Sequence, residues 1–180
     1  MTQTDEWVLY SAEPVYNRSC ASCRFCCTAV PVEGDGWAKP AGERCRHECH
    51  KGCAIYETRP NPCRYWSCRW LFDPAARELR RPDRVGYAVA PDLDTILING
   101  KPIPVAQVWC DPARPEAHRD PALRRYLGVL GVPTIIRFGN AASIVLFPPS
   151  LSPTGDWQET DRQTPDPPDV FARKLTRARS

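Results

Sequence analysis

Nine of the ten cysteines in this chain lie between Cys20 and Cys68, and the first four follow the pattern Cys20-x-x-Cys23-x-x-Cys26-Cys27. A packed core does not need so many thiols in so short a segment, because one or two buried cysteines serve as small apolar residues. Thiols at this density are typical of disulfide frameworks or of sites for soft metal ions. This segment therefore constrains the fold more than any other feature.

The N-terminal sequence favours metal over disulfides. Residues 1–7 have neither the basic nor the apolar part of a secretory signal. No apolar run reaches the roughly 18 residues needed to cross a bilayer. We therefore expect a cytoplasmic protein with no membrane partner. In a reducing compartment, clustered cysteines bind metal more often than they form disulfides.

Length and charge limit the fold and the partners. A chain of 180 residues suits one modest domain, and its 20 prolines indicate short helices and many loops. The net charge of +3 is too small to indicate a nucleic-acid-binding protein. We expect a metal ion to be the main partner.

Composition divides the chain into two parts. We expect one α+β domain over residues 1–150, with a helical cysteine-rich metal module at 17–72 packed on a small antiparallel sheet with one helix at 73–150. Residues 151–180 are polar and rich in proline, which predicts a mobile, disordered tail. Its basic end could bind an acidic protein partner, although a solvated tail is the simpler interpretation.

Hydrophobic alternation and turn residues predict the elements of the sheet. Strands are predicted at residues 7–10, 84–90, 95–98, 103–110, 134–138 and 142–147. Tight turns are predicted at Asn99-Gly100 and Gly139-Asn140. A helix is predicted at 122–130, because Asp120-Pro121 precedes it and Gly131 follows it.

Two conformations would bring the first four cysteines together. A helix capped by Ser19 would place them on one face, since three of them would fall within about 60° of one another. A loop with the same spacing would suit wrapping around one ion or cluster. Both alternatives stay open at this point.

Five more cysteines follow in the module, at Cys45, Cys49, Cys53, Cys63 and Cys68. Asn61 as an N-cap and Pro62 as a first helical residue predict a helix from Cys63 to Leu71. Cys63 and Cys68 are five residues apart, so a regular helix would turn them to different faces. They would then serve different sites, or one would lie at a frayed end.

This pattern, with Cys45 and the run Cys53-x-Ile55-Tyr56-x-x-Arg59-Pro60-x-x-Cys63-x-x-x-x-Cys68, resembles the CxxCxxCC family of zinc- or iron-chelating proteins, the YkgJ-type cysteine cluster. The resemblance covers residues 17–72. It implies eight metal ligands, which are Cys20, Cys23, Cys26, Cys27, Cys45, Cys53, Cys63 and Cys68. The same motif occurs in flagellin lysine-N-methylases, which look like iron–sulfur proteins acting with S-adenosylmethionine.

Three functions fit these observations. The first is a cytosolic metal-binding protein that holds zinc or an iron–sulfur centre in its cysteine cluster. The second is a small iron–sulfur redox enzyme or a methyltransferase-type enzyme that uses S-adenosylmethionine. The third is a metal-stapled interaction module without catalysis. Eight thiolates would form two tetrahedral Cys₄ zinc sites, or one four-cysteine iron–sulfur cluster with the other thiols structural.

The remaining chemistry-bearing residues have simpler interpretations. We expect His47 and His50 to be surface residues, and Cys49 stays unassigned. Cys110, at the end of a predicted strand, is expected to be a core thiol. Four aromatic residues are expected to wrap the metal core: Tyr56, Tyr65, Trp66 and Trp70.

Overall fold

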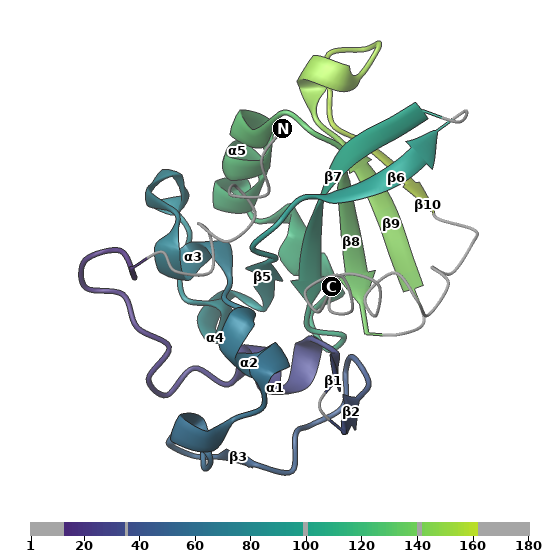
Figure 1. Ribbon diagram of the computed structural model, residues 1–180. Coiled ribbons are helices and arrows are strands. Elements are labelled where there is room, and N and C mark those ends of the chain that lie inside the picture. The colour runs from purple at the N-terminus through teal and green to yellow at the C-terminus, as the bar shows by residue number, and fades with distance from the viewer. Residues whose placement is uncertain (1–12, 35, 99–100, 140–141, 162–180) are drawn as a thin grey trace, which may run out of the picture.

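A computed structural model describes residues 13–34, 36–98, 101–139 and 142–161 (Figure 1). The α-helices are α1 (Phe25–Ala29), α2 (Asn61–Tyr65), α3 (Arg69–Phe72), α4 (Pro82–Val85) and α5 (Pro121–Leu130). The 3₁₀ helices are η1 (Tyr56–Thr58), η2 (Pro74–Ala76), η3 (Pro115–Arg119) and η4 (Pro149–Leu151). The strands are β1 (Val32–Gly34), β2 (Trp37–Lys39), β3 (Glu48–Cys49), β4 (Gly52–Cys53), β5 (Tyr87–Val89), β6 (Asp94–Ile98), β7 (Lys101–Cys110), β8 (Thr134–Phe138), β9 (Ala142–Phe147) and β10 (Gln158–Asp161).

The fold is a mixed α+β structure built on one sheet. Its strands run in the order β10-β9-β8-β7-β5, and β6 pairs with the first half of β7. The prediction of a wholly antiparallel sheet is wrong for one pair, because β7 and β8 are parallel. The chain between them passes through η3 and α5, and a crossover of this length returns the next strand in the same direction. The predicted strands at 95–98, 103–110, 134–138 and 142–147 are confirmed.

Helix α5 forms where the sequence predicts it. The Asp120 side chain accepts a hydrogen bond from the Ala122 backbone N–H at 2.9 Å, and Pro121 supplies a first residue that needs no partner for its nitrogen. Gly131 ends the helix with a φ of +65°, in the left-handed region that glycine adopts without strain. The buried face of the helix then packs on the sheet.

The strand predicted at 84–90 is shorter than expected. Pro82 begins helix α4, which ends at Gly86 with a φ of +83°, and strand β5 starts only at Tyr87. The alternation of apolar residues there resembles a strand, but the proline and the glycine set the helix bounds. The predicted strand at 7–10 and the turn residues 99–100 and 140 lie outside the described residues.

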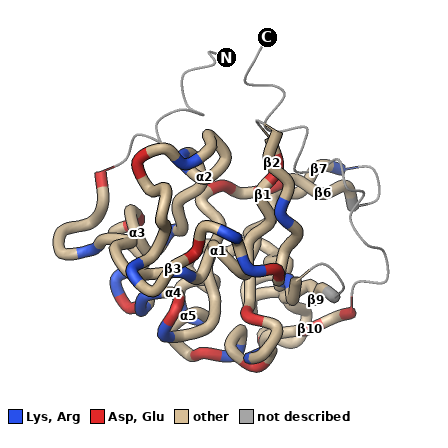
Figure 2. Tube along the Cα trace, turned by 90° about the horizontal axis from the view of Figure 1, so that it is seen from below, with Lys and Arg blue, Asp and Glu red and all other residues tan. Residues whose placement is uncertain are grey.

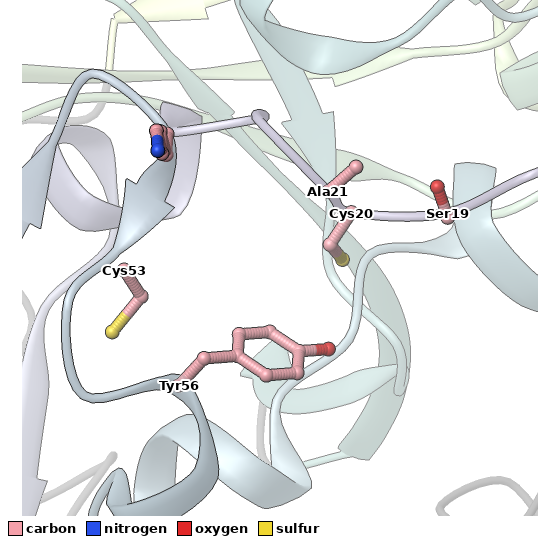
Figure 3. A pocket seen from close by; sticks show the side chains of 6 residues that line it. Ser19, Cys20, Ala21, Cys53 and Tyr56 are labelled. Atoms are coloured by element: carbon pink, nitrogen blue, oxygen red, sulfur yellow. The ribbon is translucent and has the colours of Figure 1, made fainter.

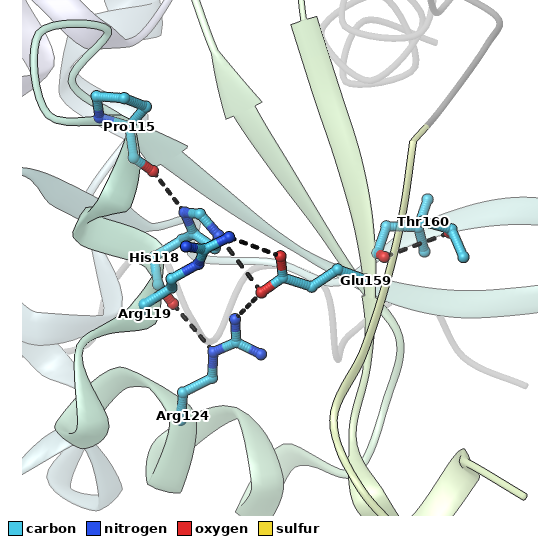
Figure 4. A network of polar contacts seen from close by, with 7 residues as sticks. Pro115, His118, Arg119, Arg124, Glu159 and Thr160 are labelled. Atoms are coloured by element: carbon cyan, nitrogen blue, oxygen red, sulfur yellow. Dashed lines mark hydrogen bonds and ion pairs between the residues drawn. The ribbon is translucent and has the colours of Figure 1, made fainter. Parts of the chain in front are cut away.

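The predicted disorder of 151–180 is wrong for its first part. Residues 158–161 form β10, which pairs with β9. Glu159 accepts hydrogen bonds from Arg124 and from Arg119, the latter at 3.4 Å, and faces His118 Nε2 at 3.5 Å (Figure 4). These contacts hold the strand against η3 and α5. Residues 162–180 lie outside the described residues.

Two hydrophobic clusters lie on opposite faces of the sheet. One joins the sheet to α5 and contains Val108, Cys110 and Leu127. The other joins the sheet to the cysteine-rich segment and contains Ala88 and Trp109. Neighbouring residues of β5 and β7 serve different clusters because side chains alternate along a strand. The prediction that Cys110 is a core thiol is confirmed.

No helix among the described residues has the length and apolarity required to cross a bilayer.

The α5 face of the sheet should carry much of the stability. Leu127→Ala removes a fully buried side chain, so we expect the free energy of unfolding in urea to fall by about 2–5 kcal/mol. Val129→Ala, two residues away on the same helix, is the control because Val129 is 77% exposed. Its loss should stay within about 0.5 kcal/mol. Equal losses would contradict the packing of α5 on the sheet.

Candidate metal centre

The first cysteines lie in a turn that leads into a short helix. The Cys23 backbone N–H donates to the Cys20 carbonyl at 2.6 Å, and α1 begins only at Phe25. Ser19 does not cap this helix, since the N-cap position belongs to Arg24. The loop alternative therefore holds for Cys20 and Cys23, and the helical alternative only for the adjacent pair that follows them. Adjacent helical residues point about 100° apart, so the side chains of Cys26 and Cys27 leave the helix in different directions.

The middle of the module folds back on this helix. The Cys45 backbone N–H donates to the Cys27 carbonyl at 2.8 Å, and the Glu48 N–H donates to the Cys45 carbonyl at 3.0 Å. Strands β3 and β4 form a small hairpin in which Glu48 is opposite Cys53. Backbone contacts thus bring Cys45 and Cys53 beside Cys27, although 25 residues lie between Cys27 and Cys53.

The predicted helix from Cys63 to Leu71 is wrong, because it is broken in the middle. Helix α2 ends at Tyr65, α3 begins at Arg69, and the backbone between them is extended. The break lets Trp66 and Cys68 both pack in the hydrophobic cluster under the sheet, which one continuous helix would prevent. Cys63 and Cys68 therefore lie on separate elements.

One set of four cysteines gathers around the buried Cys68. Cys23 and Cys26 pack against the same hydrophobic cluster as Cys68. Burial raises the pKa of the Cys68 thiol to about 12, and the neighbouring thiols of Cys20 and Cys23 contribute to that rise. The pKa of Cys26 is raised by its hydrogen bond to Cys27, by burial, and by Cys20 and Cys23. We call Cys20, Cys23, Cys26 and Cys68 the inner set.

A second set of four gathers around Cys63. Burial raises the pKa of the Cys63 thiol to about 11, and the thiols of Cys45, Cys27 and Cys53 add to the rise. The pKa of Cys53 is raised by burial and then by Cys27 and Cys45. Interactions of this kind weaken steeply with distance, so these groups are close neighbours. We call Cys27, Cys45, Cys53 and Cys63 the outer set.

The two sets meet at the adjacent pair Cys26 and Cys27. The Cys26 thiol donates a hydrogen bond to Cys27, which lowers the pKa of Cys27 to about 7. The Cys27 thiol also raises the pKa of Cys20, so the sets are neighbours and not separate regions of the fold. All ten cysteines carry free thiols.

The thiols are gathered but not arranged as ligands. In residues 13–34, 36–98, 101–139 and 142–161, no three His, Cys, Asp or Glu side chains lie in a geometry that holds a metal ion. Binding would therefore require the sulfurs to move toward one another. Metal sites commonly take their final geometry only when the ion is bound.

Two buried nitrogen atoms fit a thiolate centre. Arg59 Nε and Trp66 Nε1 are both buried without a hydrogen-bond partner among the described residues. Arg59 lies close enough to Cys20, Cys53 and Cys63 to oppose the rise in their pKa values. Trp66 packs in the cluster that contains Cys68. An unpaired buried N–H is costly, and deprotonated sulfurs nearby would accept its hydrogen bond. The donor set and these two groups therefore fit a soft metal.

Two charged residues beside the thiols were not predicted from the sequence. Burial lowers the pKa of Lys39, while nearby Cys45, Cys26, Cys27 and Cys63 oppose that change. The Glu48 side chain is only 7% exposed and pairs with Arg24 at 3.4 Å and Arg44 at 3.3 Å. No motif marks either residue, since each reaches the thiols only through the folding of the chain. Figure 2 shows basic residues on β2, on α2 and near α1.

The remaining expectations are partly met. His50 is exposed as expected, whereas His47 is half-buried and stacks on Trp37 with ring centroids 5.0 Å apart. Cys49 pairs with Gly52 in the hairpin. Of the four aromatic residues expected to wrap the centre, Trp66 and Trp70 pack against the hydrophobic cluster that contains Cys68. The other two, Tyr56 and Tyr65, are 43% and 46% exposed.

Comparison with known proteins adds no assignment. No family model, no curated protein and no solved structure matches this chain.

Gly52 should be essential to the shape of this segment. A Cβ atom at Gly52 would lie 2.5 Å from the Ala21 carbonyl oxygen, and its φ of +118° is strained for any other residue. Gly36 has a φ of +76°, but a Cβ atom there would have no neighbour within 4 Å, so Gly36→Ala tests backbone strain alone. We expect Gly52→Ala to lower the free energy of unfolding by at least about 1 kcal/mol more than Gly36→Ala does. Equal losses would show that the hairpin does not need its close contact with Ala21.

Proposed function

We propose that this protein binds metal through two neighbouring four-cysteine sites, one formed by the inner set and one by the outer set. The observation that carries the proposal is the division of the eight thiols into two groups of four around Cys68 and Cys63. Four thiolates satisfy the tetrahedral coordination of zinc, and four cysteines also hold an iron–sulfur cluster.

The adjacent pair explains how two sites fit in one small segment. Cys26 points into the inner set and Cys27 into the outer set, because successive helical residues face different directions. A single helix turn thus supplies one ligand to each site. The resemblance to the CxxCxxCC family implies the same eight ligands, although not their division into two sites.

The charge of the segment also favours two sites. Residues 17–72 contain nine Lys and Arg residues against five Asp and Glu residues, a formal surplus of four positive charges. Eight thiolates with two divalent ions carry a formal charge of −4, which this surplus balances. One filled four-cysteine site would leave positive charge uncompensated. Near-neutrality matters here because charge in a poorly solvated site is costly.

Metal binding is favoured over catalysis. The pocket beside the thiols has a volume of about 250 Å³, below the range of roughly 300–1,000 Å³ typical of sites for organic substrates. S-adenosylmethionine would need a larger pocket. We therefore place the enzyme functions second to a metal-binding protein of the cytoplasm, in which zinc or iron also links the segments of the module to one another.

Metal analysis of anaerobically purified protein, together with its visible spectrum, tests the proposal. We expect two zinc ions per chain, or iron and sulfide with the broad visible absorption of an iron–sulfur cluster. Chelation under reducing conditions should lower the melting temperature, since the ion contributes to folding. Purified protein that contains no metal and takes up neither zinc nor iron would contradict the proposal.

Single cysteine variants test the division into sets. Cys23→Ser should remove the metal of the inner set and Cys63→Ser that of the outer set, so each variant should keep about half of the wild-type content. Cys110→Ala is the control, because that thiol is buried in the other cluster and its variant should keep all the metal. Complete loss from either ligand variant would instead indicate one shared centre.

Metal uptake should strengthen as the pH rises. The pKa values of Cys63 and Cys68 are raised by burial to about 11 and about 12, so both thiols are protonated at neutral pH in the metal-free protein. Each must lose a proton when it binds metal, and a higher pH favours that loss. Competition with a chromophoric chelator should give a higher apparent affinity at pH 8 than at pH 6, after correction for protonation of the chelator. An unchanged affinity would exclude protonated thiols as ligands.

A further inference from the structure

An open pocket of about 250 Å³ reaches the thiols from the surface (Figure 3). Its lining residues come from the first turn of the module, the β3–β4 hairpin and η1: Ser19, Cys20, Ala21, Lys51, Cys53 and Tyr56. Cys20 belongs to the inner set and Cys53 to the outer set. Figure 3 shows these two side chains on different walls of the pocket, with the Tyr56 ring alongside. One ligand of each proposed site is therefore accessible from a single opening.

Backbone contacts fix the walls of the pocket. The hairpin approaches the turn so closely that a side chain at Gly52 would collide with the Ala21 carbonyl. The turn itself is tight, since the Cys23 N–H bonds to the Cys20 carbonyl and Ala21 has a φ of +34°. A side chain in this backbone region is strained, and such strain is held only where surrounding structure imposes it.

The pocket is positively charged. Lys51 lines it, and no carboxylate is among the described residues that form its lining. The Arg59 guanidinium stacks on the Tyr56 ring, 3.8 Å from the ring centroid, and is close enough to Cys20 and Cys53 to oppose the rise in their pKa values. Lys51 in the lining and Arg59 against the Tyr56 ring attract anions and repel cations.

The rest of the inner set is less accessible. Cys68 is 7% exposed, and Cys23 and Cys26 pack against hydrophobic residues under the sheet. A reagent or ligand that approaches from solvent meets Cys20 before it meets these thiols. The same pocket offers Cys53 as the accessible member of the outer set.

We propose that this pocket is the site at which metal is exchanged, and that its charge selects small anionic thiols and chelators as the exchange partners. The inference rests on the proposed metal-binding function and adds a ligand class and a route to it. In such an exchange, a donor atom of the incoming anion would form a bond to the ion as the bond to the sulfur of Cys20 or Cys53 breaks, and the released thiolate would take a proton from water and leave hydroxide. No change of oxidation state would be needed.

Alkylation of the metal-free, reduced protein tests access and charge selection without any metal. Iodoacetate is anionic and iodoacetamide is neutral, and peptide mapping reports the rate at each cysteine. Cys20 and Cys53 should react faster than Cys68. Lys51→Glu should lower the iodoacetate-to-iodoacetamide rate ratio at Cys20 and Cys53 by at least about threefold at low ionic strength, because it reverses a charge at the opening. Lys101→Glu, an exposed lysine at the start of β7, should leave both ratios unchanged.

Zinc transfer from the loaded protein tests exchange itself. Lys51→Glu should slow transfer to anionic EDTA by at least about threefold and leave transfer to the neutral chelator TPEN unchanged, and added salt should remove the difference. If Lys51→Glu and Lys101→Glu respond alike in both assays while the protein still binds metal, the pocket is not the exchange site. If the protein binds no metal at all, the proposed function is wrong. The alkylation assay uses metal-free protein, so it does not report on that function.

Discussion

The contact between the cysteine-rich segment and the strands β5 and β7 is the interaction on which the rest of the structure depends. Ala88 and Trp109 supply the sheet's side of this contact, and Phe25 and Cys68 supply the segment's side. The segment has few apolar residues of its own to bury, so the sheet provides its core. Arg18 holds the start of the segment to α3 and η2 by donating hydrogen bonds to the carbonyls of Trp70 and Ala76. Burial of Cys23, Cys26 and Cys68 thus depends partly on a neighbouring part of the fold.

This burial has opposite effects on the free and the deprotonated thiols. A protonated cysteine behaves as a small apolar residue and is stable in such a position. A lone thiolate there is unfavourable, and burial is therefore the largest cause of the raised pKa of Cys68. A cation reverses the balance, because it neutralises the sulfurs where water cannot. For other thiols the chain itself provides part of that compensation, since Arg59 opposes the rise in the pKa of Cys53 and Lys39 helps to lower that of Cys27.

Local sequence signals predicted the regular elements, and tertiary packing determined what they missed. Asp120, Pro121 and Gly131 are sufficient to define α5, because caps act within one turn of the helix. The break between α2 and α3 has no such signal, since it follows from burial of Trp66 and Cys68 under a distant sheet. The ordering of β10 depends similarly on Glu159 and its partners on α5 and η3. The eight candidate ligands could be named from their pattern, but not their division into two sets, which depends on the fold of the 41 residues that lie between them.

The order of the segments along the chain has a consequence for the protein during its synthesis. The cysteines of the module precede Ala88 and Trp109, so they leave the ribosome before the surface that buries them exists. Synthesis proceeds at about 5–20 residues per second, which leaves the thiols exposed to solvent for several seconds. In that interval they are open to oxidation and to adventitious ions. The cluster that contains Cys68 can therefore close only after Trp109, its last contributor in the chain, has been synthesised.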